Sequence, residues 1–278
     1  GEACDRLLYG EANPSGRLAE TFPYRLEDNP SYLHFPGNGK RVLYGEDIFV
    51  GYRYYDTKKV LVRYAFGHGL SYTEFAYGDL NLSSAQMTDE DILTVSFKVK
   101  NTGKTEGKEV VQLYVADLCG TPERPVKELK GFAKVHLLPG EEKTVSMEIS
   151  ARDLSYYEER LGDWYAPSGT YRILIGHASD DIRLHADIIF ETQKELPLCV
   201  DFTTTFGELL DHTKTAPVIT ELLAPLAAAA ASAEGMSDEY KKQGEQVIRE
   251  MPLKSLMGQM PGEQVEQLIG QLNCLLAQ

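Results

Sequence analysis

The sequence has no apolar run long enough to cross a membrane, and it has few cysteines for its length. A membrane-spanning helix needs about 20 consecutive apolar residues, and no stretch of the 278 residues approaches that length. The four cysteines are far apart and form no Cys-x-x-Cys pair: Cys4, Cys119, Cys199 and Cys274. This spacing indicates neither a zinc site nor a disulfide framework. It predicts buried free thiols, which favour a reducing, cytoplasmic compartment.

The sequence also lacks an excess of basic residues. Its 28 Lys and Arg are outnumbered by 42 Asp and Glu, which gives a formal net charge of -14. Nucleic acids and anionic membrane surfaces would repel such a chain, so we expect neither as a partner. The histidines do not pair with Cys or carboxylate residues at metal-ligand spacing, and we expect no metal and no cofactor.

Apolar residues interleaved with polar ones dominate the middle of the chain. They run through Arg124–Gly140 to a Pro-Gly turn and continue with Val145, Met147 and Ile149 at a strict period of two. A period of two is typical of a strand with one buried face. About seven such strands with regularly spaced turns predict an antiparallel β-sandwich over Phe75–Glu191. Its other expected strands are Ile92–Lys100, Glu109–Asp117, Thr170–His177 and Asp181–Phe190.

Residues 1–23 carry the pattern of a helix, a turn and a strand. Leu7 and Leu8 can lie on one face of a short helix that ends at Gly10, and Leu18–Phe22 is predicted to be a strand stopped by the following proline. Helix, turn and strand at this length are expected at the last edge of an α/β unit. The chain opens without an initiator Met or a signal-peptide pattern, so we expect it to be cut from something longer.

Residues 24–74 are expected to form a connecting segment, and they are rich in aromatic side chains. Tyrosine and phenylalanine are concentrated within Arg41–Thr73. Such a strip can line a sugar site, because aromatic faces stack on pyranose C–H groups, or it can pack between two domains. Arg53 can contact a substrate or hold a neighbouring carboxylate in an ion pair. The candidates for substrate binding are therefore Glu46, Arg53 and Tyr55.

Other polar and aromatic residues have both a functional and a structural interpretation. The adjacent carboxylates Glu46-Asp47 and Asp180-Asp181 are expected in solvated turns, and His68 is expected in a turn between two glycines. Trp164 is either a carbohydrate platform or a cover for the core or a strand edge. Tyr171 fits the tyrosine corner of a β-sandwich, which is a stabilising role.

Past Glu191 the strand pattern ends and a helical tail is predicted. Thr205 and Glu208 have the spacing of a capping box. Gly262–Leu276 places its apolar residues three and four apart, so one face should dock on the rest of the chain or on a second subunit, as a homo-oligomer. Its polar face is not basic, so membrane attachment is not expected. The other helical candidates are Val218–Ala231, bent or broken by Pro225, Ser237–Met251 and Pro252–Met260.

Several motifs, in this order, resemble the C-terminal portion of family 3 glycoside hydrolases, the β-glucosidases and β-xylosidases. They are GEANPSGRLAETFP, YGEDIFVGYRYYDTKKV with AFGHGLSYTEFAY, and RPVKELKGFAKVHLLPGE with ARDLSYY. The resemblance implies a mainly β chain with four parts. Residues 1–23 would be the remnant of an α/β sandwich, 24–74 a connection, 75–191 a fibronectin-III-like module related to immunoglobulin folds, and 192–278 the helical tail.

The resemblance also implies that the catalytic residues lie outside this sequence. In the family, an N-terminal (β/α)8 barrel carries the Asp nucleophile and the α/β sandwich lends a Glu acid/base. Retaining glycosidases hold these two carboxyl groups about 5 Å apart. Neither motif has a counterpart here, so we nominate no catalytic residue. The expected partners are the missing barrel and α/β sandwich, through which carbohydrate would be bound.

Three functions remain as hypotheses, in this order. The chain is the non-catalytic C-terminal portion of a glycosidase acting on β-linked glucosides or xylosides, stabilises the catalytic domains and shapes the entrance to their site. It is a freestanding carbohydrate-binding sandwich, which would need an exposed aromatic platform that includes Trp164. Or it is a structural module whose helical tail makes a homo-oligomer.

Overall fold

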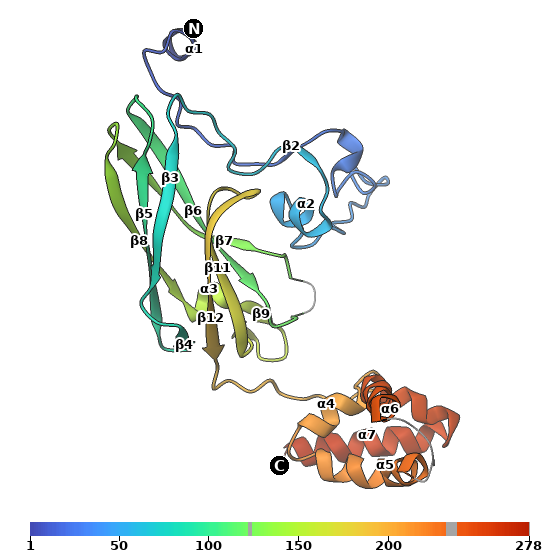
Figure 1. The fold of residues 1–278 in the computed structure, drawn as a ribbon. Helices are drawn as coiled ribbons and strands as arrows, with labels where there is room; N and C mark the ends of the chain where they lie inside the picture. Colours follow the sequence, from blue (N-terminus) through green and yellow to red (C-terminus); the bar gives the residue numbers. More distant parts are fainter. Residues whose placement is uncertain (122–123, 232–237, 278) are drawn as a thin grey trace. The chain divides into compact units, whose positions relative to one another are not determined.

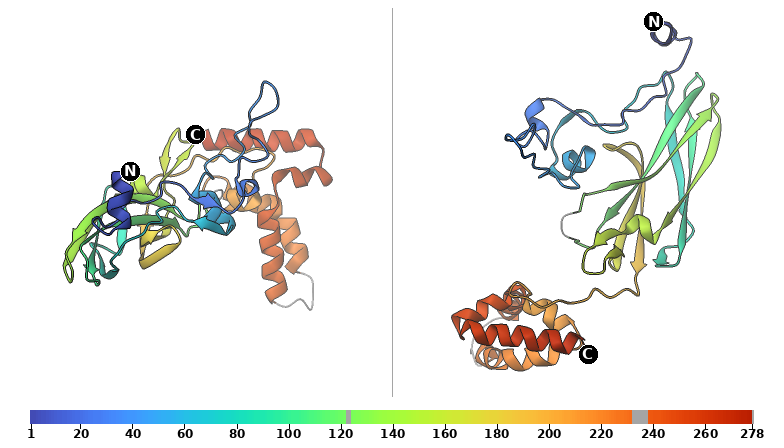
Figure 2. Two further views of the ribbon diagram at one scale, coloured as in Figure 1. Left: turned by 90° about the horizontal axis from the view of Figure 1, so that it is seen from above. Right: turned by 180° about the vertical axis from the view of Figure 1, so that it is seen from behind.

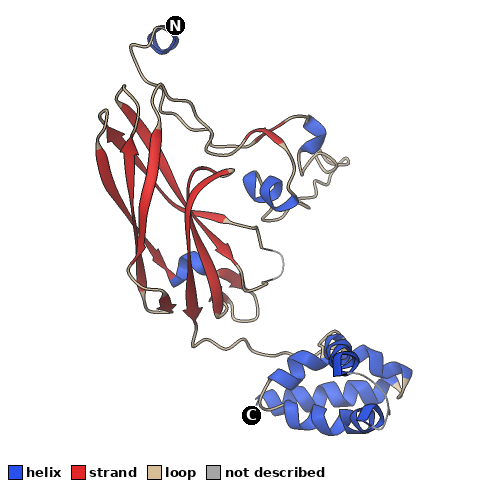
Figure 3. Ribbon diagram, viewed as in Figure 1, coloured by secondary structure: helices blue, strands red, loops and turns tan. Residues whose placement is uncertain are grey.

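The structure is a computed structural model that describes residues 1–121, 124–231 and 238–277. The chain divides into two compact units, Gly1–Glu195 and Leu196–Gln278 (Figure 1). Each unit has a hydrophobic core of its own. Every strand of the described residues lies in the first unit, while the second is helical (Figure 3). The predicted succession of a mainly β region and a helical tail is confirmed.

Two sheets form the predicted β-sandwich in the first unit (Figure 2). The larger sheet has the strand order β4-β12-β11-β6-β7, and the smaller has the order β3-β5-β8. All neighbouring strands are antiparallel except β4 and β12, which are parallel. The strands are β3 (Phe75–Leu82), β4 (Gln86–Thr88), β5 (Ile92–Asn101), β6 (Gly107–Asp117), β7 (Glu128–Leu137), β8 (Glu142–Ser150), β11 (Gly169–Ala178) and β12 (Asp181–Glu191).

The core of the sandwich comes from the alternating residues of these strands. Every second residue of β5 is buried from Leu93 to Val99, and the same holds for β11 from Tyr171 to Ile175. Because successive side chains of a strand point to opposite faces, a period of two in the sequence places one set between the sheets. Burial of these aliphatic and aromatic groups is the main driving force for this fold.

Three short elements lie between β8 and β11: α3 (Ala151–Leu154), β9 (Tyr156–Glu158) and β10 (Asp163–Tyr165). Just after them, the buried hydroxyl of Tyr171 donates a hydrogen bond to the carbonyl of Pro167, 3.0 Å away and four residues upstream. This is the geometry of a tyrosine corner, as predicted for Tyr171.

The first 74 residues contain α1 (Glu2–Leu8), β1 (Phe22–Pro23), η1 (Leu26–Asp28), α2 (Tyr52–Lys58) and β2 (Val62–Tyr64). The predicted strand Leu18–Phe22 is wrong in extent, because the strand begins only at Phe22 and pairs with β2. The backbone of Leu18 instead exchanges hydrogen bonds with the loop at Gly67 and His68. The connecting segment contains the helix α2, which is capped at its C-terminus by Lys59 in the left-handed conformation.

The second unit contains α4 (Phe206–Asp211), α5 (Ala216–Ala231), α6 (Asp238–Glu250), η2 (Leu253–Gly258) and α7 (Gly262–Ala277). The predicted capping box is present, since the Thr205 hydroxyl accepts from the backbone N–H of Glu208. Pro225 lies inside α5 and does not break it. Ser237, the predicted start of α6, lies outside the described residues.

The apolar face of α7 packs within its own unit. Val265 and Leu272 are buried in the core of the helical unit, and Leu268, Ile269 and Leu276 pack against it. The face therefore docks on this chain, which was one of the two predicted possibilities. The homo-oligomer stays a prediction.

The cysteines are free, as predicted, but the expectation that they are buried is wrong. Cys4, Cys199 and Cys274 are exposed, and Cys119 is half-buried. Cys4 lies on α1, which has no buried residue, and Cys274 lies on the outer side of α7. Within the described ranges, no helix combines the length and apolar character that a membrane span requires.

Candidate functional site

A buried ion pair joins the N-terminal segment to the sandwich. Arg17, from the loop after α1, donates through Nη2 to Oε2 of Glu109 on β6 at 2.5 Å. The side chain of Glu109 has no exposed surface and that of Arg17 is 8% exposed. Two charges so far from water are tolerated only when they are paired and further hydrogen-bonded. The contact therefore fixes the loop around Arg17 on the sheet.

His177 and Tyr77 complete the shell around Glu109. The Tyr77 hydroxyl donates to Oε1 of Glu109 at 2.6 Å, and Nδ1 of His177 lies 2.5 Å from the same oxygen. Nε2 of His177 lies 2.7 Å from Nη1 of Arg17. A guanidinium only donates, so this geometry assigns Nε2 as acceptor and Nδ1 as donor. Burial and the negative charge of Glu109 raise the pKa of Tyr77 far above its usual range, so the phenol stays a donor.

A second set of contacts docks α2 on the start of β7. The Tyr52 hydroxyl accepts from the backbone N–H of Leu129 at 2.8 Å, and the Thr57 hydroxyl accepts from that of Val126 at 3.2 Å. Lys127 and Asp56 form an ion pair at 2.8 Å. The sequence around β7 thus supplies the surface on which the connecting segment is held.

Glu128 is the centre of this second set. Arg53 and Arg124 lie 3.0 and 2.6 Å from its carboxylate oxygens, and Lys130 lies 3.5 Å away. Burial disfavours the charged form of Glu128, but the charges of Lys130, Arg124 and Arg53 outweigh it and lower the pKa of Glu128. The carboxylate therefore stays ionised and holds three cations together.

The three predicted substrate-binding residues lie in different surroundings. Arg53 lies on α2 in the ion pair with Glu128. Tyr55 is only 3% exposed and packs against Tyr54, and burial raises the pKa of its hydroxyl. Glu46 lies in a turn before α2, and its Oε2 is buried without a hydrogen-bond partner. Their role in substrate binding stays a prediction.

One aromatic face of Trp164 is covered by a charged side chain. The guanidinium of Arg152 lies over its ring, 3.0 Å from the centroid, and the ring of Tyr157 meets it edge to face at 5.6 Å. The exposed fraction of Trp164 is 37%, so its ring is only partly covered. The structural interpretation of Trp164 accounts for these contacts.

The other residues singled out in the sequence lie in turns or, like Asp181 at the start of β12, directly beside one. Asp180 is in the turn between β11 and β12, and Asp181 pairs with Arg183 at 2.6 Å. The backbone N–H of His68 donates to the carbonyl of Ala65, and its ring packs on Tyr64. These positions agree with the expected turns.

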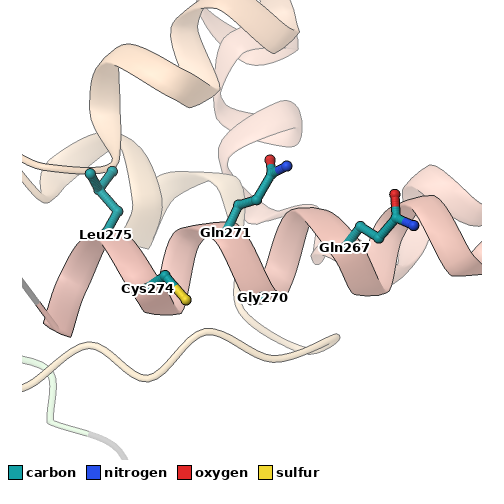
Figure 4. Close-up of a pocket in the computed structure, with 5 residues that line it drawn as sticks. All are labelled: Gln267, Gly270, Gln271, Cys274 and Leu275. Carbon is teal, nitrogen blue, oxygen red and sulfur yellow. The ribbon is translucent and has the colours of Figure 1, made fainter.

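A groove of about 750 Å³ lies beside His68 in the first unit. Its lining is mostly apolar: Leu7, Asn13, Pro14, Ser15, Gly16, Arg17, Leu18, Phe22, Tyr64, His68, Gly69 and Leu70. A smaller groove of about 480 Å³ lies along α7, and Figure 4 shows the residues that line it: Gln267, Gly270, Gln271, Cys274 and Leu275. Glycoside hydrolysis by retention or inversion needs two carboxyl groups, and neither lining contains one. Within the described ranges, no cluster of His, Cys, Asp and Glu could hold a metal ion.

The Arg17–Glu109 contact was not predicted, although the position of Glu109 in the strand pattern indicates that this residue is buried. Glu109 is in phase with Val111, Leu113 and Val115, which are buried. A charged residue at an inward position of a strand requires a buried partner. The identity of that partner is not encoded locally, because Arg17 is 92 residues away.

The fold thus defines a fibronectin-III-like β-sandwich that carries an N-terminal segment and a helical unit. Comparison with family profiles agrees. The glycosyl hydrolase family 3 C-terminal domain matches residues 1–72, and the fibronectin type III-like domain matches residues 109–179.

Known relatives match along the same regions. The thermostable beta-glucosidase B of Acetivibrio thermocellus is 43% identical over 98% of this chain, the helical unit included, and a beta-glucosidase of Kluyveromyces marxianus is 48% identical over 70%. The crystal structure of a GH3 beta-glucosidase from Bifidobacterium adolescentis superimposes with a TM-score of 0.70 at 38% identity, over 79% of this chain and 32% of that one. Beta-glucosidase 3B from Thermotoga neapolitana, in complex with glucose, superimposes with a TM-score of 0.63 at 42% identity, over 68% of this chain and 26% of that one.

The chain belongs to glycoside hydrolase family 3, and it corresponds to the C-terminal part of its β-glucosidase members. It spans about a third of the Acetivibrio relative, 36%, and 23% of the Kluyveromyces relative. Arg17 and Arg53 lie in the region that matches the family 3 C-terminal domain, and their partners Glu109 and Glu128 lie in the region that matches the fibronectin type III-like domain.

Proposed function

We propose that this chain is the non-catalytic C-terminal portion of a β-glucosidase, in which it stabilises the catalytic domains. One observation carries the proposal: the thermostable beta-glucosidase B of Acetivibrio matches 98% of this chain, yet the chain spans only 36% of that relative. The ion pairs and hydrogen bonds around Glu109 and Glu128 support a stabilising role, since they hold residues 1–74 on the sandwich. The substrate class of the whole enzyme is β-linked glucosides, with xylosides as the alternative.

The test is turnover of aryl-β-glucosides and aryl-β-xylosides by the chain alone and by a mixture. The second component is the N-terminal part of the Acetivibrio enzyme, ending before the residue aligned with Gly1. We expect no turnover by the chain alone, because general acid–base and nucleophilic catalysis both require the missing carboxylates. Activity that the chain restores to the N-terminal part supports the proposal. Turnover by the chain alone contradicts it.

Independent carbohydrate binding has less support. A sugar platform needs an accessible aromatic face, and Arg152 lies over that of Trp164. Titration of the isolated chain with cellobiose and xylobiose distinguishes a freestanding binding module from a non-catalytic portion of an enzyme. Sugar binding by the chain alone that is lost in the Trp164→Ala variant would favour the binding module.

A further inference from the structure

Exposed apolar side chains are concentrated at one end of the first unit. More than half of the large apolar side chains that are exposed in the described residues lie in residues 1–72. Within that region we call Ser31–Val50 the docking segment. Leu33 is 86% exposed, Tyr44 79% and Phe35 73%. Several large apolar side chains exposed within one short segment indicate an interaction site.

The docking segment is held by local backbone contacts. The N–H of His34 donates to the carbonyl of Ser31, Asn38 and Arg41 form an isolated bridge, and the N–H of Phe49 donates to the carbonyl of Glu46. These turns present the apolar side chains outward and fix the position of Glu46. The arrangement is that of a preformed surface.

Glu46 gives an independent indication that this surface lacks a hydrogen-bond donor. Its Oε2 is buried, yet no donor within the described chain reaches it. A buried carboxylate oxygen without a donor is costly. Asp47, the next residue, carries the same charge but is exposed. Glu46 is thus suited to receive a positively charged side chain from outside the chain.

We propose that the docking segment binds the N-terminal part of the same β-glucosidase, and that Glu46 accepts a cationic side chain from it. This inference rests on the proposed function and adds the contact surface and its polar anchor. A second copy of this chain is a poorer occupant, because a formal net charge of -14 on each copy opposes self-association. A basic group of the N-terminal part would satisfy the orphaned oxygen while the apolar side chains are covered.

The electrostatic test compares Glu46→Gln with Asp47→Asn, which makes the same change in charge at the neighbouring exposed position. Affinity for the N-terminal part of the Acetivibrio enzyme is measured by calorimetry, and complementation by aryl-β-glucoside turnover. We expect Glu46→Gln to weaken binding by about tenfold or more, since one partner of a buried charge pair is lost. Asp47→Asn should stay within about twofold, as for an exposed charge.

Thermal unfolding of the isolated chain supplies a second readout. Oε2 of Glu46 has no hydrogen-bond partner in the described chain, so Glu46→Gln should not lower the melting temperature. A lower melting temperature together with unchanged affinity overturns the inference, because Glu46 would then be bonded within the chain.

The apolar part is tested by Leu33→Ser, with Leu138→Ser as control. Leu138 is also exposed, at 52%, but it follows β7 outside the docking segment. Leu33→Ser should weaken binding by about tenfold, the loss expected for one buried leucine, and Leu138→Ser should not. If wild-type chain restores activity and every variant binds equally, the inference is overturned while the proposed function stands. If wild-type chain neither binds nor restores activity, both are overturned.

Discussion

Arg17 and Glu109 are 92 residues apart in the sequence, and their side chains meet at 2.5 Å in a site almost closed to water. Arg17 lies in the region that matches the family 3 C-terminal domain, and Glu109 lies on the first strand of the region that matches the fibronectin-III-like domain. Regions matched by two different family profiles thus share one buried polar centre. The first unit should therefore unfold as a whole rather than in pieces.

Glu109→Gln should lower the free energy of unfolding by about 3 kcal/mol, because Arg17 would remain buried without its counter-charge. Urea denaturation at neutral pH measures this. In the double variant with Arg17→Met, the loss should be smaller than the sum of the two single losses, since both charges are then removed. A loss below about 1 kcal/mol for Glu109→Gln would mean that the pair contributes no more than a surface ion pair.

The stability of the chain should fall in acid, partly through Glu158. A hydrogen bond from Arg160 lowers the pKa of Glu158 from 4.5 to about 2, against the opposing effect of burial. A pKa lowered by folding adds stability that is complete above about pH 4.5 and is lost as the pH falls toward 2. Urea denaturation at pH 7 and pH 3 should show a larger acid-induced loss for the wild type than for Glu158→Gln. Equal losses would contradict the role of Glu158.

Glu128→Gln should loosen the attachment of α2 to β7. Arg53, Arg124 and Lys130 would then face one another without the carboxylate that lies between them. We expect a loss of about 2 to 4 kcal/mol in the free energy of unfolding and faster hydrogen exchange in Tyr52–Lys58. Glu148→Gln, at an exposed position of β8, is the control and should change stability by less than about 0.5 kcal/mol. Unchanged exchange in α2 would show that its apolar contacts suffice.

Thr205→Ala should destabilise the helical unit by about 1 kcal/mol, because the hydroxyl of Thr205 caps α4. Thr220→Ala is the matched control. Thr220 is exposed inside α5 and its hydroxyl bonds only to the helix backbone at Ala216, so alanine should be neutral or stabilising there. Thermal unfolding followed by circular dichroism at 222 nm compares the two. A control that is as unstable as Thr205→Ala would argue against the cap.

Local sequence patterns correctly predicted the elements that depend on interactions between residues close in the sequence. The strands of the sandwich follow from alternation with period two, since every second side chain of a strand must be buried on the same face. The cap of α4 could be predicted from Thr205 and Glu208, because the two residues that form it are only three positions apart. The predicted strand Leu18–Phe22 was too long because its backbone bonds to a distant loop at Gly67 and His68.

The candidate site was less predictable. Glu46 and Arg53 were named because they lie beside aromatic residues in the sequence. In the structure, one carboxylate oxygen of Glu46 has no hydrogen-bond donor, and the guanidinium of Arg53 forms an ion pair with Glu128. Three of the four cysteines were expected inside and are exposed. Whether a given side chain is buried depends on which element covers it, and that element is often far away in the sequence.

The sequence by itself determined the β-sandwich, the helical tail and the membership of glycoside hydrolase family 3, because periodicity, caps and motifs are written in neighbouring residues. Only the tertiary structure decided that Arg17, Glu109, His177 and Tyr77 share one buried centre, and that Glu46 is left without a donor. Those relationships depend on contacts between residues that are far apart in the sequence. A buried charge is stabilised by such distant partners, and the local sequence does not identify them.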